Sequence, residues 1–162
     1  MEPRKLPQLV QKDELINLLP HKGKMFLLDH LVAHDTVGRS LESISYVTKD
    51  HIFYDETLDG IPSHVAFELI AQSISALSGV TGCERGEPAK PGFLLSLQNY
   101  KATAPVFKNG SEIHVAIKKV DELDSMLTYS GVAYIEGEPT NIIVDTTITV
   151  METTDLSVLG TK

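Results

Sequence analysis

The chain has 162 residues, which suits one domain and is too short for two ordinary ones, and its 42% hydrophobic share suffices for a core. A formal net charge of −8 argues against a nucleic-acid-binding surface, which needs an electropositive face. The single cysteine, Cys83, excludes an internal disulfide framework. The N-terminus has neither a signal-peptide pattern nor a membrane span, so a cytoplasmic location is expected.

The N-terminal part of the chain predicts one short helix and two strands. Asp13 begins a capped helix that is expected to end at Pro20. Residues 25–35 and 39–48 then have the composition of two strands joined by a polar turn. Residues 49–62 contain several turn residues and no regular pattern, which indicates a loop.

The segment that starts at Ser63 predicts a long buried helix. Ser63 suits the N-cap position, and Gly79 and Gly82 are expected to end the helix after about sixteen residues, or about 24 Å. Its apolar residues are not confined to one stripe, so we expect other parts of the protein to cover it on nearly every side. A helix of this length, interrupted by polar residues, is too short to span a membrane.

Four runs rich in β-branched and aromatic residues follow and predict four more strands. They cover residues 92–102, 111–120, 126–135 and 140–150, with turn residues at 108–110 and 136–139. Short sequential connections predict an antiparallel meander. The fold class is therefore α+β: a single domain over 1–162, with an antiparallel sheet of about six strands around one helix. Its ends, about 1–12 and 152–162, are expected to be flexible.

Glu68 is the acidic residue in the middle turns of the predicted helix. A carboxylate in a buried helix needs a partner, or it holds its proton more tightly than in water. A tightly held proton is what a general acid needs near neutral pH. The alternative is that Glu68 caps the helix or lies on a hydrated face. Gln72 follows one turn later and can hold the carboxyl group by a hydrogen bond.

Histidines supply the candidate bases. His64 precedes Glu68 by four residues, so both can lie on one helix face; the alternative is a histidine at the helix start that contacts solvent. His51 lies in the preceding loop and is a second candidate. His21 lies in the loop between the first helix and the first strand. The sequence has no phosphate-binding loop, metal-ligand cluster or nucleophile elbow, so it predicts acid–base chemistry without a cofactor or metal.

Short motifs of one family recur from about Leu18 to Met151. They are Leu18-Leu19-Pro20-His21, Met25-Phe26-Leu27-Leu28-Asp29, Glu68-Leu69-Ile70-Ala71-Gln72, Phe93-Leu94-Leu95, Tyr100-Lys101-Ala102 and Pro105-Val106-Phe107. In order and spacing they resemble the 3-hydroxyacyl-[acyl carrier protein] dehydratases of bacterial fatty acid synthesis. Within this group, the chain is most similar to the ApeP-like dehydratases associated with aryl polyene gene clusters.

This resemblance implies a hot-dog fold that works as a homodimer or a higher oligomer, and a substrate carried on acyl carrier protein through phosphopantetheine. It implies that Glu68 protonates the departing C3 hydroxyl of a 3-hydroxyacyl thioester, leaving a trans-2-enoyl thioester. His21, Gln72, Phe93 and Leu94 are then the expected substrate contacts.

The family's catalytic histidine, in a Gly-His-Phe-Pro-Gly motif, has no match, because Tyr54 holds the position expected for it. We therefore expect His64, or else His51, to act as the base. Two alternatives stay open. The chain can be an acyl thioesterase, since hot-dog thioesterases also carry a carboxylate on this helix, or a non-catalytic subunit that pairs with an active dehydratase.

Overall fold

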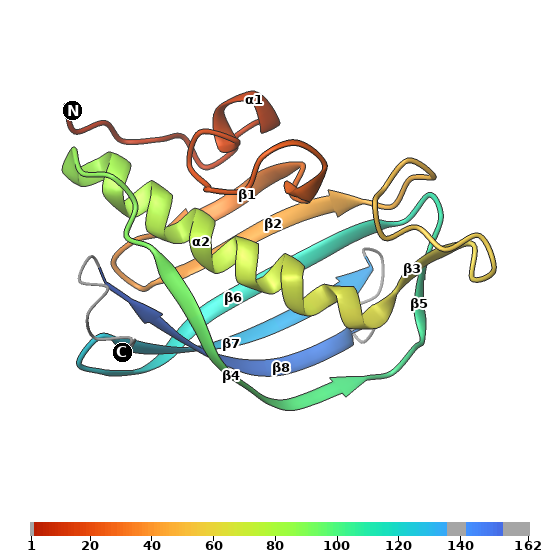
Figure 1. Cartoon of the computed structure of the whole chain (residues 1–162). Helices are drawn as coiled ribbons and strands as arrows, with labels where there is room; N and C mark the ends of the chain where they lie inside the picture. Colours follow the sequence, from red (N-terminus) through yellow and green to blue (C-terminus); the bar gives the residue numbers. More distant parts are fainter. Residues whose placement is uncertain (1, 136–141, 154–162) are drawn as a thin grey trace, which may run out of the picture.

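The computed structural model describes residues 2–135 and 142–153. In Figure 1 one long helix, α2 (Ala66–Arg85), crosses the concave face of a curled sheet. The remaining helices and strands, in chain order, are α1 (Lys12–Leu15), β1 (His30–Asp35), β2 (Ser40–Tyr46), β3 (Gly60–Pro62), β4 (Gly92–Ala102), β5 (Val106–Lys108), β6 (Glu112–Leu123), β7 (Met126–Ile135) and β8 (Ile142–Glu152).

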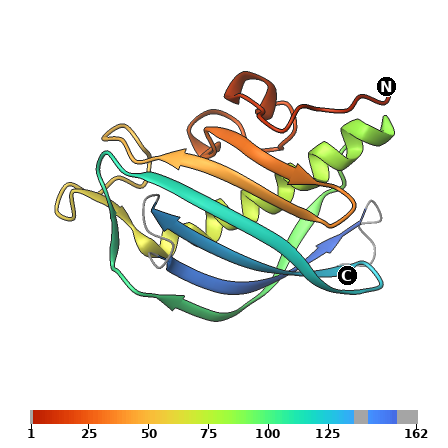
Figure 2. The same cartoon turned by 180° about the vertical axis from the view of Figure 1, so that it is seen from behind.

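The predicted six-stranded antiparallel sheet around a buried helix is confirmed. The strand order is β1-β2-β6-β7-β8-β4, and β3 pairs with β5 in a separate small sheet. Alternate residues of β6, namely Ile113, Val115 and Ile117, are buried beneath the helix because successive side chains of a strand face opposite ways. Seen from behind, α2 lies beyond the sheet, so the helix covers one face only (Figure 2).

The expected meander is correct only for β6, β7 and β8. β4 pairs with β8 rather than with the next long strand, β6, and so forms one edge of the sheet. The physical reason is the path of the chain. Helix α2 spans the sheet diagonally, and the chain leaving its C-terminal end reaches the edge beyond β8 (Figure 1).

The boundaries of α2 differ from those expected. A 3-10 turn, Ser63–Val65, precedes it, and Ser63 makes no capping bond; its backbone N–H donates to Pro105 instead. The helix passes through Gly79 and ends at Gly86, which adopts the left-handed conformation with φ of 70°. A side chain at Gly79 would lie 2.3 Å from the carbonyl oxygen of Leu18. Gly79 therefore allows the N-terminal segment to approach the helix.

The segment Ser63–Arg85 reaches 23 residues and is long and apolar enough to cross a membrane by length and composition alone. However, 72% of its most apolar window is buried inside the fold, as expected for a core helix. The sequence-based argument that the helix is too short therefore does not hold. Burial by the sheet accounts for its apolar character instead.

The N-terminal segment packs against the fold, although the sequence indicates a flexible end there. Leu6 and Val10 are 3% and 2% exposed, and Val10 pairs with Leu31 at the start of β1. α1 is one turn long, shorter than the predicted helix that ends at Pro20. The predicted turn at 136–139 and the C-terminal end from residue 154 lie outside the described residues.

Candidate active site

The first turn of α2 places Glu68 beside two polar side chains. Its side chain is 23% exposed, and its Oε1 accepts a hydrogen bond from Gln72 Nε2 at 3.0 Å. The Nε2 atom of His21 lies 3.5 Å from the same oxygen. The Glu68 carboxylate therefore has the polar partners that a carboxylate in a largely buried position needs. The expected Glu68–Gln72 hydrogen bond is confirmed.

Gln72 joins the helix to the segment before β1. It is fully buried, its Oε1 accepts from the backbone N–H of Leu27 at 2.9 Å, and its Nε2 also donates to the carbonyl of Met25 at 2.8 Å. A buried amide with these three partners is fixed in orientation. Gln72 lies behind the Glu68 carboxylate rather than in the cavity wall, so its contact with substrate stays a prediction.

A cavity of about 460 Å³ opens in front of Glu68. It lies between α2, the segment Asn17–His21 and the start of β4. His21 and Glu68 line it, as do apolar side chains of α2, β4 and β8; these are Ala71, Ile74, Leu94 and Val150. An imidazole, a carboxylate and an apolar wall are the groups that acid–base chemistry on an acyl chain requires.

The two substrate contacts expected on β4 fall on different sides of the strand. Leu94 lines the cavity, whereas Phe93 is half-buried and does not belong to its wall. Adjacent residues of a strand point in opposite directions, so only one of them can face the cavity. The structure brings His21, Glu68 and Leu94 together and leaves Phe93 outside.

His64, the base preferred on sequence grounds, is not brought to Glu68. It is exposed, and among the described residues it makes no ion pair with the Glu68 carboxylate. The reason is its position in the 3-10 turn ahead of α2. A 3-10 turn has three residues per turn rather than 3.6, so a four-residue spacing no longer places two side chains on one face.

His51 lies in another cavity, of about 390 Å³, lined also by Lys12, Lys24 and Tyr46. Its Nδ1 accepts a hydrogen bond from the backbone N–H of Phe53 at 3.1 Å, and burial lowers the pKa of its imidazole. The structure therefore does not place His51 in the cavity of Glu68.

Tyr54, at the position where the family has its histidine, belongs to the loop before β3. Its hydroxyl donates to Asp59 at 2.6 Å, and this bond raises the pKa of Tyr54 to about 12. A phenol with that pKa stays protonated at neutral pH and is a poor base. Tyr54 thus does not replace the missing imidazole.

The pairing of His21 with Glu68 is the main feature that sequence reasoning missed. The two residues are 47 positions apart, and no local periodicity connects them. Gly79 could have pointed to this pairing. A glycine can mark the end of a helix, but it can equally mark a place where another backbone segment comes close. Leu18 occupies that space and brings His21, three residues later, to the helix.

A long helix wrapped by a six-stranded antiparallel sheet defines the hot-dog fold. Residues 14–160 match the family model ApeP-like, described as ApeP dehydratase, and the chain belongs to this family. Its relatives include two 3-hydroxyacyl-[acyl-carrier-protein] dehydratases named FabZ. The FabZ of Shewanella denitrificans is 26% identical, and the match covers 77% of this chain and 82% of the relative. The FabZ of Haemophilus ducreyi is 22% identical, and the match covers 82% of this chain and 86% of the relative.

Among solved structures, the dehydratase heterocomplex ApeI:P from Xenorhabdus doucetiae matches with a TM-score of 0.79 at 20% identity, covering 90% of this chain and 95% of that one. A hypothetical thioesterase with coenzyme A from Streptococcus pneumoniae matches with a TM-score of 0.55 at 10% identity, covering 72% and 80%. At these identities the structural matches establish the fold.

Proposed function

We propose that this chain takes part in the dehydration of a 3-hydroxyacyl thioester on acyl carrier protein, in fatty acid or aryl polyene-type biosynthesis. The observation that carries the proposal is the Glu68 carboxylate, held by Gln72 beside His21 at the end of an apolar cavity. Membership of a dehydratase family supports the reaction type. An apolar cavity fits the acyl chain, and the two titratable groups fit proton transfer.

In the proposed reaction Glu68 is the acid and His21 is the base. His21 Nε2 removes a proton from C2, and the electron pair of that C–H bond forms the C2=C3 double bond. The C3–O bond breaks, and Glu68 delivers its proton to the departing hydroxyl, which leaves as water. The 3.5 Å between His21 Nε2 and Glu68 Oε1 then lets the proton return to Glu68.

This assignment has a stereochemical consequence. Because acid and base lie next to each other on one wall of the cavity, the C2 proton and the C3 hydroxyl must leave from the same side of the chain. Substrates carrying deuterium at one or the other C2 position test this directly. Loss of the label from the side opposite the hydroxyl would contradict His21 as the base.

A second candidate role is that of a subunit that completes a dehydratase without its own base. Two observations favour it. Tyr54 stands where the family has a histidine and is engaged by Asp59, and the solved structure of the Xenorhabdus protein is a heterocomplex. Assaying the chain alone and mixed with a related dehydratase separates the roles. Release of thiol from a saturated acyl thioester in the same assay would indicate a thioesterase instead.

The free edge of the sheet supports an oligomer in either role. β4 pairs only with β8, and its exposed side chains include Leu94, Leu95 and Leu97 at 49%, 45% and 40%. An exposed apolar edge strand is a ready template for pairing with another chain. We propose that β4 pairs with a second copy, or with a related dehydratase.

Leu97→Asp should convert a dimer to a monomer in analytical ultracentrifugation, since it places a charge on the pairing edge. Leu123→Asp is the matched control because Leu123 is also exposed, at 63%, but lies at the distant end of β6. A monomeric wild-type chain that also fails to pair with a related dehydratase would contradict the proposal.

A further inference from the structure

Two loops contribute to the wall of the cavity at Glu68. One is the segment Asn17–His21, which carries the proposed base, and the other is residues 89–91, just before β4. The second loop lies near Ser78, which is about 15 Å from Glu68 along the helix axis at 1.5 Å per residue. A loop holds a catalytic group in place only as well as its own contacts fix it.

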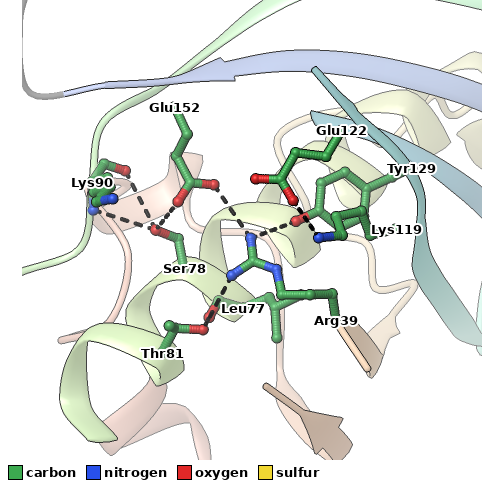
Figure 3. A network of polar contacts seen from close by, with 9 residues as sticks. All are labelled: Arg39, Leu77, Ser78, Thr81, Lys90, Lys119, Glu122, Tyr129 and Glu152. Atoms are coloured by element: carbon green, nitrogen blue, oxygen red, sulfur yellow. Dashed lines mark hydrogen bonds and ion pairs between the residues drawn. The ribbon is translucent and has the colours of Figure 1, made fainter. Parts of the chain in front are cut away.

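The loop before β4 is tied to α2 and β8 by side-chain contacts (Figure 3). The backbone N–H of Lys90 donates to Ser78 Oγ at 3.3 Å, and Ser78 Oγ donates to Glu152 Oε1 at 3.3 Å. Arg39 Nη2 lies 3.5 Å from Glu152 Oε2 and donates to the hydroxyl of the fully buried Tyr129 at 2.7 Å. The side chains of Arg39 and Glu152 are only 15% and 13% exposed, so this loop is anchored to largely buried groups.

The loop that carries His21 has no backbone ladder to hold it. Within the part of the chain that the structure describes, residues 19–21 take no part in backbone–backbone hydrogen bonds. The buried side chain of Leu19 fixes the chain on one side of His21, and the 3-10 turn Gly23–Met25 begins two residues after it. Between these two points, side chains rather than backbone bonds fix the path of the chain.

Lys22 supplies hydrogen bonds that the backbone of this loop lacks. Its ammonium group donates to the carbonyls of Ile16 and Leu19, the latter at 2.8 Å. Ile16 is the C-cap residue of α1, and lysine side chains commonly bond the free carbonyls at the end of a helix. Bonds from a charged donor are stronger than neutral ones. The side chain of Lys22 thus closes a ring from Ile16 to Lys22, and His21 lies within that ring.

We propose that Lys22 is a positioning residue, whose bonds to Ile16 and Leu19 keep the His21 imidazole facing Glu68. Lys22 is exposed and does not line the cavity, whereas His21 does, so its effect on the reaction passes through His21. The proposal rests on the proposed function for the role of His21 as the base. Misplacing a catalytic group by about 1 Å lowers the rate about a hundredfold, so loosening of this loop lowers kcat.

The activity test uses 3-hydroxybutyryl-pantetheine, which brings no carrier protein for Lys22 to contact, with the chain alone and with a related dehydratase. Lys22→Met should lower kcat about tenfold and leave KM within about twofold of wild type. Lys22→Arg keeps several N–H donors and should recover most of the loss. Lys24→Met is the matched control, because Lys24 is exposed and lines the cavity of His51 instead.

Two results of this test would overturn the proposal. One is a kcat in Lys22→Met equal to that of Lys24→Met, which would show that the ammonium group does not act on the reaction. The other is an equal loss in Lys22→Met and Lys22→Arg, which would show that the hydrogen bonds to the two carbonyls are not the cause.

A measurement without turnover separates this proposal from the proposed function. Nuclear magnetic resonance relaxation at the histidine Cε1 atoms reports the order of each ring, and the His21 signal is the one missing in His21→Asn. The order of the His21 ring should fall in Lys22→Met and stay at the wild-type value in Lys24→Met. An unchanged His21 ring in Lys22→Met would overturn the positioning role.

The two measurements together distinguish the possible failures. A His21 ring loosened by Lys22→Met, in a chain that dehydrates nothing alone or with a related dehydratase, would remove the proposed function and leave the positioning role standing. Dehydration by the wild type, with an equally ordered ring and equal kcat in Lys22→Met, would do the reverse.

Discussion

The two ends of the cavity along α2 each hold a carboxylate, and their partners differ. Glu68 is held by an uncharged amide, with an imidazole 3.5 Å away, and is 23% exposed. Glu152 faces a guanidinium at the same distance and is 13% exposed. Histidine changes its charge near neutral pH, whereas arginine keeps its charge. The Glu68 end therefore pairs its carboxylate with a side chain of the kind suited to proton transfer, whereas the Glu152 end pairs its carboxylate with a permanent cation.

The largest difference is expected in catalysis. Glu68→Gln should lower the dehydration of 3-hydroxybutyryl-pantetheine at least about a hundredfold, because the amide cannot donate the proton that the leaving hydroxyl needs. Its melting temperature should change little, since the side chain keeps its shape. Glu84→Gln is the control: Glu84 lies on the same helix and bonds to Thr36, far from the cavity of Glu68. Full activity in Glu68→Gln would end the acid assignment.

The next test concerns the base at the same end. His21→Asn should reduce kcat by about a hundredfold while His64→Asn and His51→Asn stay near wild type, because of these three histidines, all within the described residues, His21 alone is paired with Glu68. A loss in His64→Asn with an active His21→Asn would restore the sequence-based assignment.

At the other end the expected effect is on stability. Arg39→Met should lower the free energy of unfolding by roughly 2–3 kcal/mol, since it leaves Glu152 buried without its cation. Lys119→Met is the matched control: Lys119 approaches Glu122 to 2.6 Å, a shorter distance, but the Glu122 side chain is 50% exposed. Solvent screens that pair, so its loss should be small. Urea denaturation measures both, and equal losses would contradict the role of burial.

The smallest effect comes from His51, which belongs to neither end. Burial lowers the pKa of His51 in the folded chain below its ordinary value of 6.5. As pH falls through 6.5 the unfolded chain therefore takes up a proton that the folded chain does not yet bind, and stability decreases. His51→Gln should make the free energy of unfolding fall less steeply between pH 7 and 5. An identical slope in the variant would show that another group dominates this range.

Local patterns predicted the helix, most strands and the Glu68–Gln72 pair. Each depends on residues a few positions apart, where periodicity is informative. The expected placement of His64 beside Glu68 depended on a local pattern too, but the two side chains are not paired, because Ser63 bonds to Pro105 and a 3-10 turn precedes the helix. The contact between Ser63 and Pro105 joins segments about 40 residues apart. The periodicity of a helical segment carries no information about such a distant contact.

The rest of the site depends on contacts between distant segments. His21 reaches Glu68 because Leu18 packs against Gly79, and Glu152 reaches Ser78 because the last strand ends beside the middle of α2. The edge position of β4 likewise follows from the path of the helix across the sheet. Sequence composition identifies the groups available for chemistry, and the packing of these segments determines which of them meet.

The most direct test of the account is a crystal structure of the chain with a 3-hydroxyacyl-pantetheine thioether of about twelve chain atoms. The account predicts the C3 hydroxyl within about 2.6–3.2 Å of the Glu68 carboxylate, His21 beside C2, and the acyl chain along the apolar wall that Ala71 and Ile74 line. An analogue bound elsewhere, or bound with Glu68 turned to solvent and His21 remote from C2, would contradict it.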